Sequence, residues 1–80
     1  MADDVMSRVI RVIAETQRIP AESVKPESTF EELKIDSLDG INIVFAIENE
    51  FNINVPDDAA KSLRSVRDVA TGVESLIAGS

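Results

Sequence analysis

Apolar residues recur three and four positions apart in three stretches of the chain, which is the spacing of one face of an α-helix. These stretches predict helices over residues 3–16, 38–51 and 66–77. A further short helix is predicted over residues 57–62, because Pro56 fits the first position of a helix and two aspartates follow it. No stretch alternates apolar and polar residues as a half-buried strand does. The pattern therefore predicts an all-α fold, a small four-helix bundle with a long first loop and a short third helix.

The first loop is predicted over residues 20–36, because Pro20 pushes the residue before it out of the helical region. Its segment 29–32, Thr-Phe-Glu-Glu, has the spacing of a capping box for a single helical turn. Three apolar residues are predicted to anchor the loop on the bundle: Val24, Phe30 and Leu33. The loop is therefore predicted to be ordered, so that residues 1–80 form one domain.

The helix predicted over residues 38–51 carries more apolar surface than one buried face requires. At about 100° per residue its side chains fall into two opposed groups. The first group is predicted to face the core: Ile43, Val44, Ile47 and Phe51. The second group is an apolar stripe, Leu38, Ile41 and Phe45, accompanied by the polar residues Asn42, Glu48 and Asn49. Since polar residues have no use in a core face, this stripe predicts a partner surface; a helix buried on both sides is the alternative.

Ser37 lies at the start of this helix, between Asp36 and Asp39. Serine is a strong N-cap residue, so Ser37 is predicted to cap the helix with its hydroxyl exposed. A helix N-terminus presents unpaired N–H groups and a partial positive charge, which stabilise a phosphate ester placed there. Ser37 is therefore a candidate attachment site for a phosphate group, and the alternative is that it only caps the helix.

The composition removes several classes of chemistry. Cysteine and histidine are both absent, which excludes disulfides, thiolate metal sites and a Ser-His-Asp arrangement. A calcium loop beginning at Asp36 fails on spacing, because Gly40 comes one position early and Ile47 stands where a glutamate belongs. We therefore expect no metal site and no catalysis by this chain itself.

Charge and hydropathy limit the possible partners. Eight basic and fifteen acidic residues give a net charge of -7, which disfavours nucleic acid and favours partners with basic patches. No apolar run has the length of a membrane span, and the N-terminal residues lack the order of a signal peptide. A cytoplasmic location is predicted.

Three segments taken together resemble the acyl carrier protein family: Asp36–Asp39, Ile41–Phe51 and Val55–Asp58. The resemblance runs in register from the Val9 region to about Ile77. It implies that Ser37 carries 4′-phosphopantetheine through a phosphodiester, and that Asp36 assists the Mg²⁺-dependent phosphopantetheinyl transferase that installs this arm. The implied function is that of a carrier, not an enzyme: it holds acyl intermediates as thioesters and presents them to biosynthetic enzymes.

The resemblance also implies where cargo and partners bind. The acyl chain is expected between the second and third helices, where ordinary core packing is the alternative for each lining residue: Ile47, Val55, Ala60 and Leu63. Besides the transferase, the expected partners are acyl-loading, ketosynthase and acyltransferase-type enzymes of fatty-acid, polyketide or related lipid biosynthesis. The surface expected to receive them consists of Leu38, Asp39, Ile41, Asn42, Phe45 and Glu48. The protein is expected to be a monomer.

Two other functions remain open. A peptidyl or aminoacyl carrier usually has a Gly-Gly-rich approach to the serine, whereas this chain has Leu33–Ile35, which favours an acyl carrier. An acidic helical adaptor without a prosthetic group would use the same apolar stripe. Four departures from the family pattern leave the pathway open between general fatty-acid and specialised chemistry: Asn42 and Asn49, where glutamate is common, and the basic Lys61 and Arg64.

Overall fold

The computed structural model of the protein describes residues 2–79. It contains the α-helices α1 (Ala2–Gln17), α2 (Ser37–Phe51), α3 (Asp57–Lys61) and α4 (Val66–Gly79), and a short 3-10 turn, η1 (Ala21–Ser23). Residues 2–79 contain no strand, only an isolated bridge between Thr29 and Ser65. The predicted all-α fold with a short third helix is confirmed, and the helix bounds differ from the prediction by no more than two residues. Met1 and Ser80, which the predicted domain includes, lie outside the described residues.

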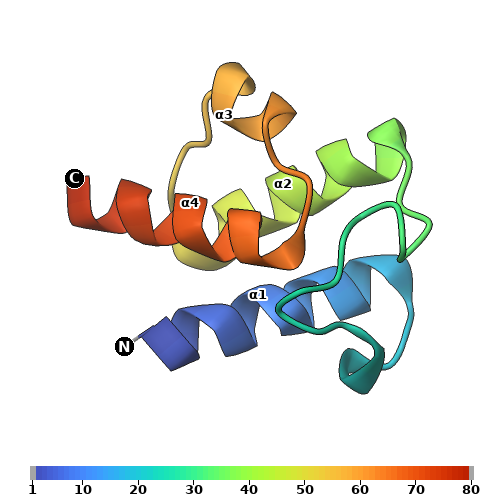
Figure 1. Cartoon of the computed structure of the whole chain (residues 1–80). Helices are drawn as coiled ribbons and strands as arrows, with labels where there is room; N and C mark the ends of the chain where they lie inside the picture. Colours follow the sequence, from blue (N-terminus) through green and yellow to red (C-terminus); the bar gives the residue numbers. More distant parts are fainter. Residues whose placement is uncertain (1, 80) are drawn as a thin grey trace.

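The helix α1 packs against both α2 and α4, and α3 lies on the other side of these two helices (Figure 1). The buried core combines residues of α1, α2 and α4 with two loop residues: Val9, Val12, Ile13, Ala14, Val24, Ile35, Ile43, Ile47, Val66, Val69, Ala70 and Val73. The predicted core face of α2 is confirmed at Ile43 and Ile47, whereas Val44 and Phe51 are only half-buried. Within residues 2–79, no helix has both the length and the apolar character needed to cross a membrane.

The loop between α1 and α2 is anchored by apolar side chains. Val24 is buried, and Phe30 and Leu33 pack against the core, as predicted. Ile35 is buried as well, although nothing in its local sequence pattern distinguishes it. The loop is therefore an ordered part of the bundle.

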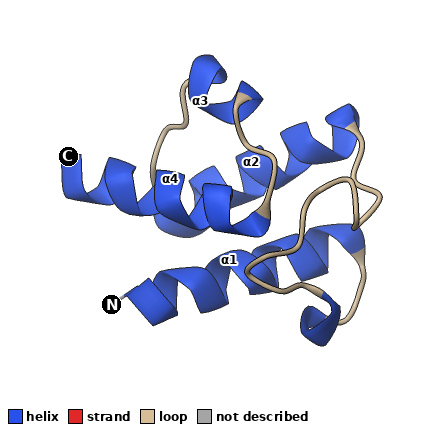
Figure 2. Ribbon diagram, in the orientation of Figure 1, coloured by secondary structure: helices blue, strands red, loops and turns tan. Residues whose placement is uncertain are grey.

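Backbone hydrogen bonds also tie this loop to the start of α4, which it passes in Figure 2. The bonds run from Phe30 N–H to the Arg64 carbonyl (2.9 Å), from Val66 N–H to the Ser28 carbonyl (2.9 Å) and from Arg67 N–H to the Pro26 carbonyl (3.1 Å). The predicted capping box is confirmed: Thr29 N–H donates to Glu32 Oε1 at 2.9 Å, and Glu32 N–H donates to Thr29 Oγ1 at 3.0 Å. The long loop thus has a fixed path toward α2.

An extended proline marks the start of α3, and side-chain hydrogen bonds mark the start of α4. Pro56 was predicted at the first helical position of α3, but in the structure it is the N-cap, one position before the helix. Ser65 Oγ accepts the N–H of Asp68 at 3.2 Å, as a capping serine does. The Asp68 carboxylate accepts the N–H of Arg64 at 3.0 Å instead of that of Ser65. The connection between α3 and α4 is therefore held by its own hydrogen bonds.

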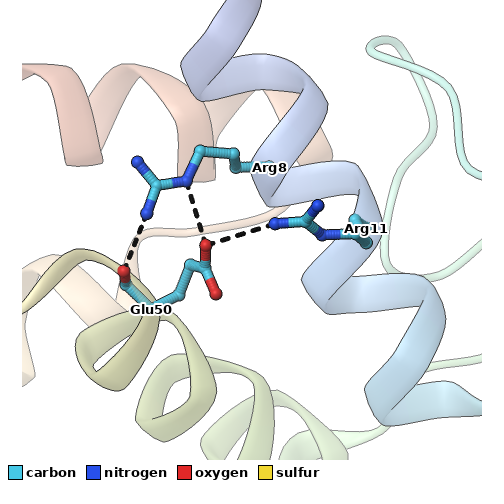
Figure 3. A network of polar contacts seen from close by, with 3 residues as sticks. All are labelled: Arg8, Arg11 and Glu50. Carbon is cyan, nitrogen blue, oxygen red and sulfur yellow. Dashed lines mark hydrogen bonds and ion pairs between the residues drawn. The ribbon is translucent and has the colours of Figure 1, made fainter.

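A polar network fixes the far end of α2 on α1 (Figure 3). Arg8 Nε and Arg11 Nη2 donate to Glu50 Oε2 at 2.9 and 3.4 Å, and Arg8 Nη2 donates to the Glu50 carbonyl oxygen at 2.9 Å. The Arg8 guanidinium also lies 4.4 Å from the centroid of the Phe51 ring. A single exposed ion pair contributes little to the free energy of folding. The stabilisation here comes from the two arginines that share one carboxylate, together with the contact between Arg8 and the Phe51 ring. They hold α2 at the end opposite Ser37.

Candidate functional site

Ser37 is the first residue of α2, and its side chain is exposed. The N-cap is Asp36 instead, because its backbone is extended and its Oδ1 accepts the N–H of Asp39 at 2.9 Å. The prediction that Ser37 caps the helix is therefore wrong by one position. With Asp36 as the cap, the Ser37 hydroxyl forms no hydrogen bond to any residue within 2–79. It is free to form an ester.

The backbone before α2 explains this placement. Lys34 adopts a left-handed conformation with φ of 59°, and Ile35 N–H then donates to the carbonyl oxygen of Phe30 at 2.8 Å. This reversal buries Ile35, and Asp36 leaves the core in the extended conformation that an N-cap requires. Aspartate and serine are both good caps, so residue type does not show which of the two caps the helix. The backbone conformation identifies Asp36 as the cap.

The surroundings of Ser37 suit a phosphate ester. The free N–H groups and the dipole at the start of α2 stabilise an anion. Asp39 is half-buried, and its Oδ2 accepts from Gln17 Nε2 at 3.5 Å, which links the start of α2 to the end of α1. No group of three or more acidic residues that could hold a metal occurs in the described part of the chain. An exposed hydroxyl at the N-terminus of α2 fits a covalent phosphate-linked group.

The apolar stripe of α2 is exposed from its first residue onward. The exposed fractions are 73% for Leu38, 50% for Ile41 and 58% for Phe45. Asn42 is exposed beside them. Since three large apolar residues on one helix face remain accessible to solvent, the alternative of a helix buried on both sides is excluded.

Two acidic residues expected on the same surface have internal partners. Glu48 is half-buried, and its Oε2 accepts the N–H of Val55 at 2.7 Å. Asp39 is half-buried and bonded to Gln17. These bonds leave the exposed part of the expected surface with a mainly apolar character around Leu38, Ile41 and Phe45.

Ser37 lines a groove, and this groove meets a separate apolar cavity. The groove, of about 930 Å³, begins at Ser37 and is bounded by α2, α3 and residues 29–31. The cavity, of about 170 Å³, is apolar and lies among α2, α3 and α4. Val44, Val55 and Leu63 line both spaces, so the groove and the cavity meet at these side chains.

The four residues expected to line an acyl pocket all face these spaces. Ile47 lines the cavity, Ala60 lines the groove, and Val55 and Leu63 line both. The prediction did not include the other apolar wall residues of the cavity: Val44, Pro56, Ala59, Val69, Gly72, Val73 and Leu76. Helical spacing identifies the apolar face of α4, but it does not show which part of that face borders empty space.

Comparisons with known proteins agree with this geometry. A family model described as a phosphopantetheine attachment site matches residues 7–73. The chain is 40% identical over 73 residues to an acyl carrier protein of Helicobacter hepaticus, covering 90% of this chain and 96% of that protein. It is 33% identical over 76 residues to an acyl carrier protein of Thermosynechococcus vestitus, covering 94% of each. The crystal structure of an acyl carrier protein from Thermotoga maritima superposes with a TM-score of 0.85 at 27% identity, covering 98% of this chain and 92% of that one. The chain therefore belongs to the acyl carrier protein family, as a carrier that bears a phosphopantetheine arm.

Proposed function

We propose that Ser37 is the residue that bears the 4′-phosphopantetheine arm, on which the protein holds acyl groups as thioesters. The observation that carries this proposal is the exposed Ser37 hydroxyl, which has no internal hydrogen bond and lies at the N-terminus of α2. The bound arm supplies the thiol that forms the thioester. The 80 residues contain no cysteine, so they supply no thiol of their own.

The residues around Ser37 have separate tasks in this proposal. The N-terminus of α2 stabilises the phosphodiester charge. Asp36 uses Oδ1 to cap the helix, and its carboxylate remains at the surface where a transferase can bring Mg²⁺. The chain has no histidine, the commonest general base, and the proposal assigns the base that accepts the Ser37 proton to the transferase.

Acyl carrier proteins work with biosynthetic enzymes, and we propose the surface and the cargo site that this chain offers them. The exposed stripe of Leu38, Ile41 and Phe45 receives the transferase and acyl-loading, ketosynthase and acyltransferase-type enzymes. The acyl chain enters the groove and reaches the cavity past Val55 and Leu63. We propose that the protein acts as a monomeric, cytoplasmic, single carrier domain.

Intact mass after co-expression with a phosphopantetheinyl transferase tests the attachment site. Wild type and Ser23→Ala, a control at an exposed serine in η1, should gain the mass of the arm. Ser37→Ala should gain none. Because Asp36 provides the cap, Ser37→Ala should also lose less than the roughly 0.5–2 kcal/mol of a cap substitution. A mass gain in folded Ser37→Ala would contradict the assignment, and an unmodified wild type would favour the adaptor function.

A further inference from the structure

Two basic residues, Lys61 and Arg64, line the same groove as Ser37. Lys61 ends α3, Arg64 lies in the connection to α4, and both side chains are exposed. Neither forms an ion pair within residues 2–79, whereas Arg8 and Arg11 share Glu50 on the other side of α2. In a chain with a net charge of -7, two unpaired cations therefore face the space that begins at Ser37.

Backbone hydrogen bonds connect Arg64 to the segment that leads into Ser37. Its carbonyl oxygen accepts the N–H of Phe30 at 2.9 Å, and the Phe30 carbonyl accepts the N–H of Ile35 at 2.8 Å. Ile35 is buried and lies two residues before Ser37. These two hydrogen bonds fix the wall that carries Arg64 relative to the wall that carries Ser37.

The groove also contains carboxylates, which determine where an anion can bind. They belong to Glu31, Asp36, Glu48 and Asp57. The carboxylates of Asp36 and Glu48 accept backbone N–H groups at 2.9 and 2.7 Å, both on the α2 side. Asp57 on α3 and Glu31 on the loop lower the positive charge near Lys61 and Arg64, but the α2 side has carboxylates and no cation in the groove. An anion in the groove is therefore favoured near Lys61 and Arg64, and guanidinium binds the oxygens of phosphate or carboxylate in a bidentate way.

We propose that Lys61 and Arg64 form an anion-binding edge for an anionic oxygen group carried on the arm of Ser37. The group is either the phosphodiester at the base of the arm or a free carboxylate at the end of a dicarboxylic acyl cargo. The inference rests on the proposed attachment at Ser37. A covalent link keeps the effective concentration of the anion at this edge high, so exposed cations suffice to bind it. Binding there draws the arm along the α3 side of the groove and away from bulk solvent.

The Nε–Hε NMR signal of Arg64 identifies the anion. Four forms are compared: apo protein, the unacylated protein with its arm, and two acylated forms whose cargoes have equal length and end in a carboxylate or a methyl group. A shift of the Arg64 signal on addition of the arm alone assigns the phosphodiester. A shift that appears only with the carboxylate-ended cargo assigns the acyl carboxylate. An Arg64 signal that is the same in all four forms overturns the proposal.

The thiol of the arm reports the consequence, because the chain has no thiol of its own. A Lys61→Gln/Arg64→Gln double variant is compared with Arg67→Gln, which removes an exposed cation of α4 outside the groove. If the anion is the phosphodiester, iodoacetamide, a neutral reagent, should alkylate the free thiol of the unacylated form roughly two- to five-fold faster in the double variant, as expected from losing exposed charge pairs. High salt should bring wild type to the same rate.

Each outcome of the alkylation experiment decides one question. Equal alkylation rates in wild type, the double variant and Arg67→Gln at low salt would contradict binding of the phosphodiester at this edge while leaving Ser37 as the attachment site. The acyl carboxylate is present only when the thiol is blocked as a thioester, so the Arg64 signal decides that case. Peptide mass mapping of each sample shows whether the arm is on Ser37. An arm located elsewhere would refute the proposed function itself. Circular dichroism of both variants confirms that they are folded.

Discussion

Asp36 and Ser37 divide two tasks between adjacent positions. Asp36 caps the start of α2 by accepting the N–H of Asp39, which leaves the Ser37 hydroxyl without an internal partner. A capping serine would have its oxygen directed at the helix backbone, and attaching a bulky group to that oxygen would disturb the cap. The arrangement therefore permits modification of the serine without loss of the helix start.

The carboxylate of Asp36 can be separated from its cap by substitution. Asparagine caps helices as well as aspartate does, so Asp36→Asn should lose only the charge interaction with the helix, about 0.3–1 kcal/mol. Asp36→Ala should lose the cap as well, a further 0.5–2 kcal/mol or so. Both variants should acquire the arm slowly, because a neutral side chain is a poorer Mg²⁺ ligand. Urea unfolding and the rate of mass gain measure the two effects, and a wild-type rate in Asp36→Asn would exclude a role for the carboxylate.

Phe45 is expected to matter more for enzyme recognition than the amide at Asn42. Phe45 is 58% exposed, so Phe45→Ala should change the free energy of unfolding by less than about 0.5 kcal/mol. An aromatic anchor in a partner pocket can contribute 2 kcal/mol or more, roughly a thirty-fold change in affinity. Asn42→Glu adds one exposed charge, worth about 0.2–1 kcal/mol toward an arginine-bearing partner.

Parallel loading assays with the native partner and with general fatty-acid enzymes test this order. Phe45→Ala should be loaded poorly by the native partner, and Asn42→Glu should mainly improve use by general fatty-acid enzymes. Circular dichroism checks that both variants are folded. Wild-type loading of folded Phe45→Ala would show that the exposed stripe is not the docking surface.

At the scale of elements, α2 is fixed at both ends and free along one face. The bond between Gln17 and Asp39 links its start to α1, and the network around Glu50 holds its last turns on α1. A helix held in this way keeps both the exposed stripe and Ser37 in a constant orientation relative to the rest of the bundle. The sequence predicted this helix and both of its faces, because the spacing of apolar residues along a helix is a local property.

What the sequence did not predict in α2 depends on segments far along the chain. Glu48 has the spacing of the exposed stripe, yet its carboxylate accepts the N–H of Val55 in the connection to α3. Ile35 is isolated in its local sequence and becomes a core residue because a left-handed Lys34 turns the chain. Neither feature produces a periodic signal, so both required the structure.

Glu48 is expected to hold the connection between α2 and α3 in place. Glu48→Ala would leave the half-buried N–H of Val55 without its acceptor, at a cost of about 1–3 kcal/mol, while the amide oxygen of Glu48→Gln can still accept this bond. Hydrogen exchange of the Val55 amide should accelerate in Glu48→Ala and stay slow in wild type and Glu48→Gln. Equal protection in all three proteins would show that the carboxylate does not hold this connection.

At the scale of the whole molecule, the three long helices bury a small core, and α3 is packed less completely. The sequence predicted the helix order and the four residues facing the groove or cavity, but not the empty volume, which depends on how α2, α3 and α4 pack together. Gly72 is an example. As a helix residue it lowers the stability of α4 by about 1 kcal/mol relative to alanine. In the structure it lines the cavity, where a side chain would otherwise stand.

Substitutions at Gly72 should separate stability from cargo binding. A Cβ added there would meet Leu63 Cδ2 at 3.9 Å, an ordinary contact, so Gly72→Ala should raise stability by about 1 kcal/mol, or roughly 4–8 °C in Tm.

Gly72→Leu would place a large side chain in a cavity of about 170 Å³ and compete with the acyl chain for that space. Thr71→Leu, at the neighbouring exposed position, adds similar bulk outside the cavity and serves as the control. If the cavity shelters the cargo, a medium-length saturated acyl group should raise the Tm of wild type and Thr71→Leu above that of their unacylated forms, but not the Tm of Gly72→Leu. An equal rise in all three proteins would place the acyl chain elsewhere, because the space beside Gly72 would then make no difference to its binding.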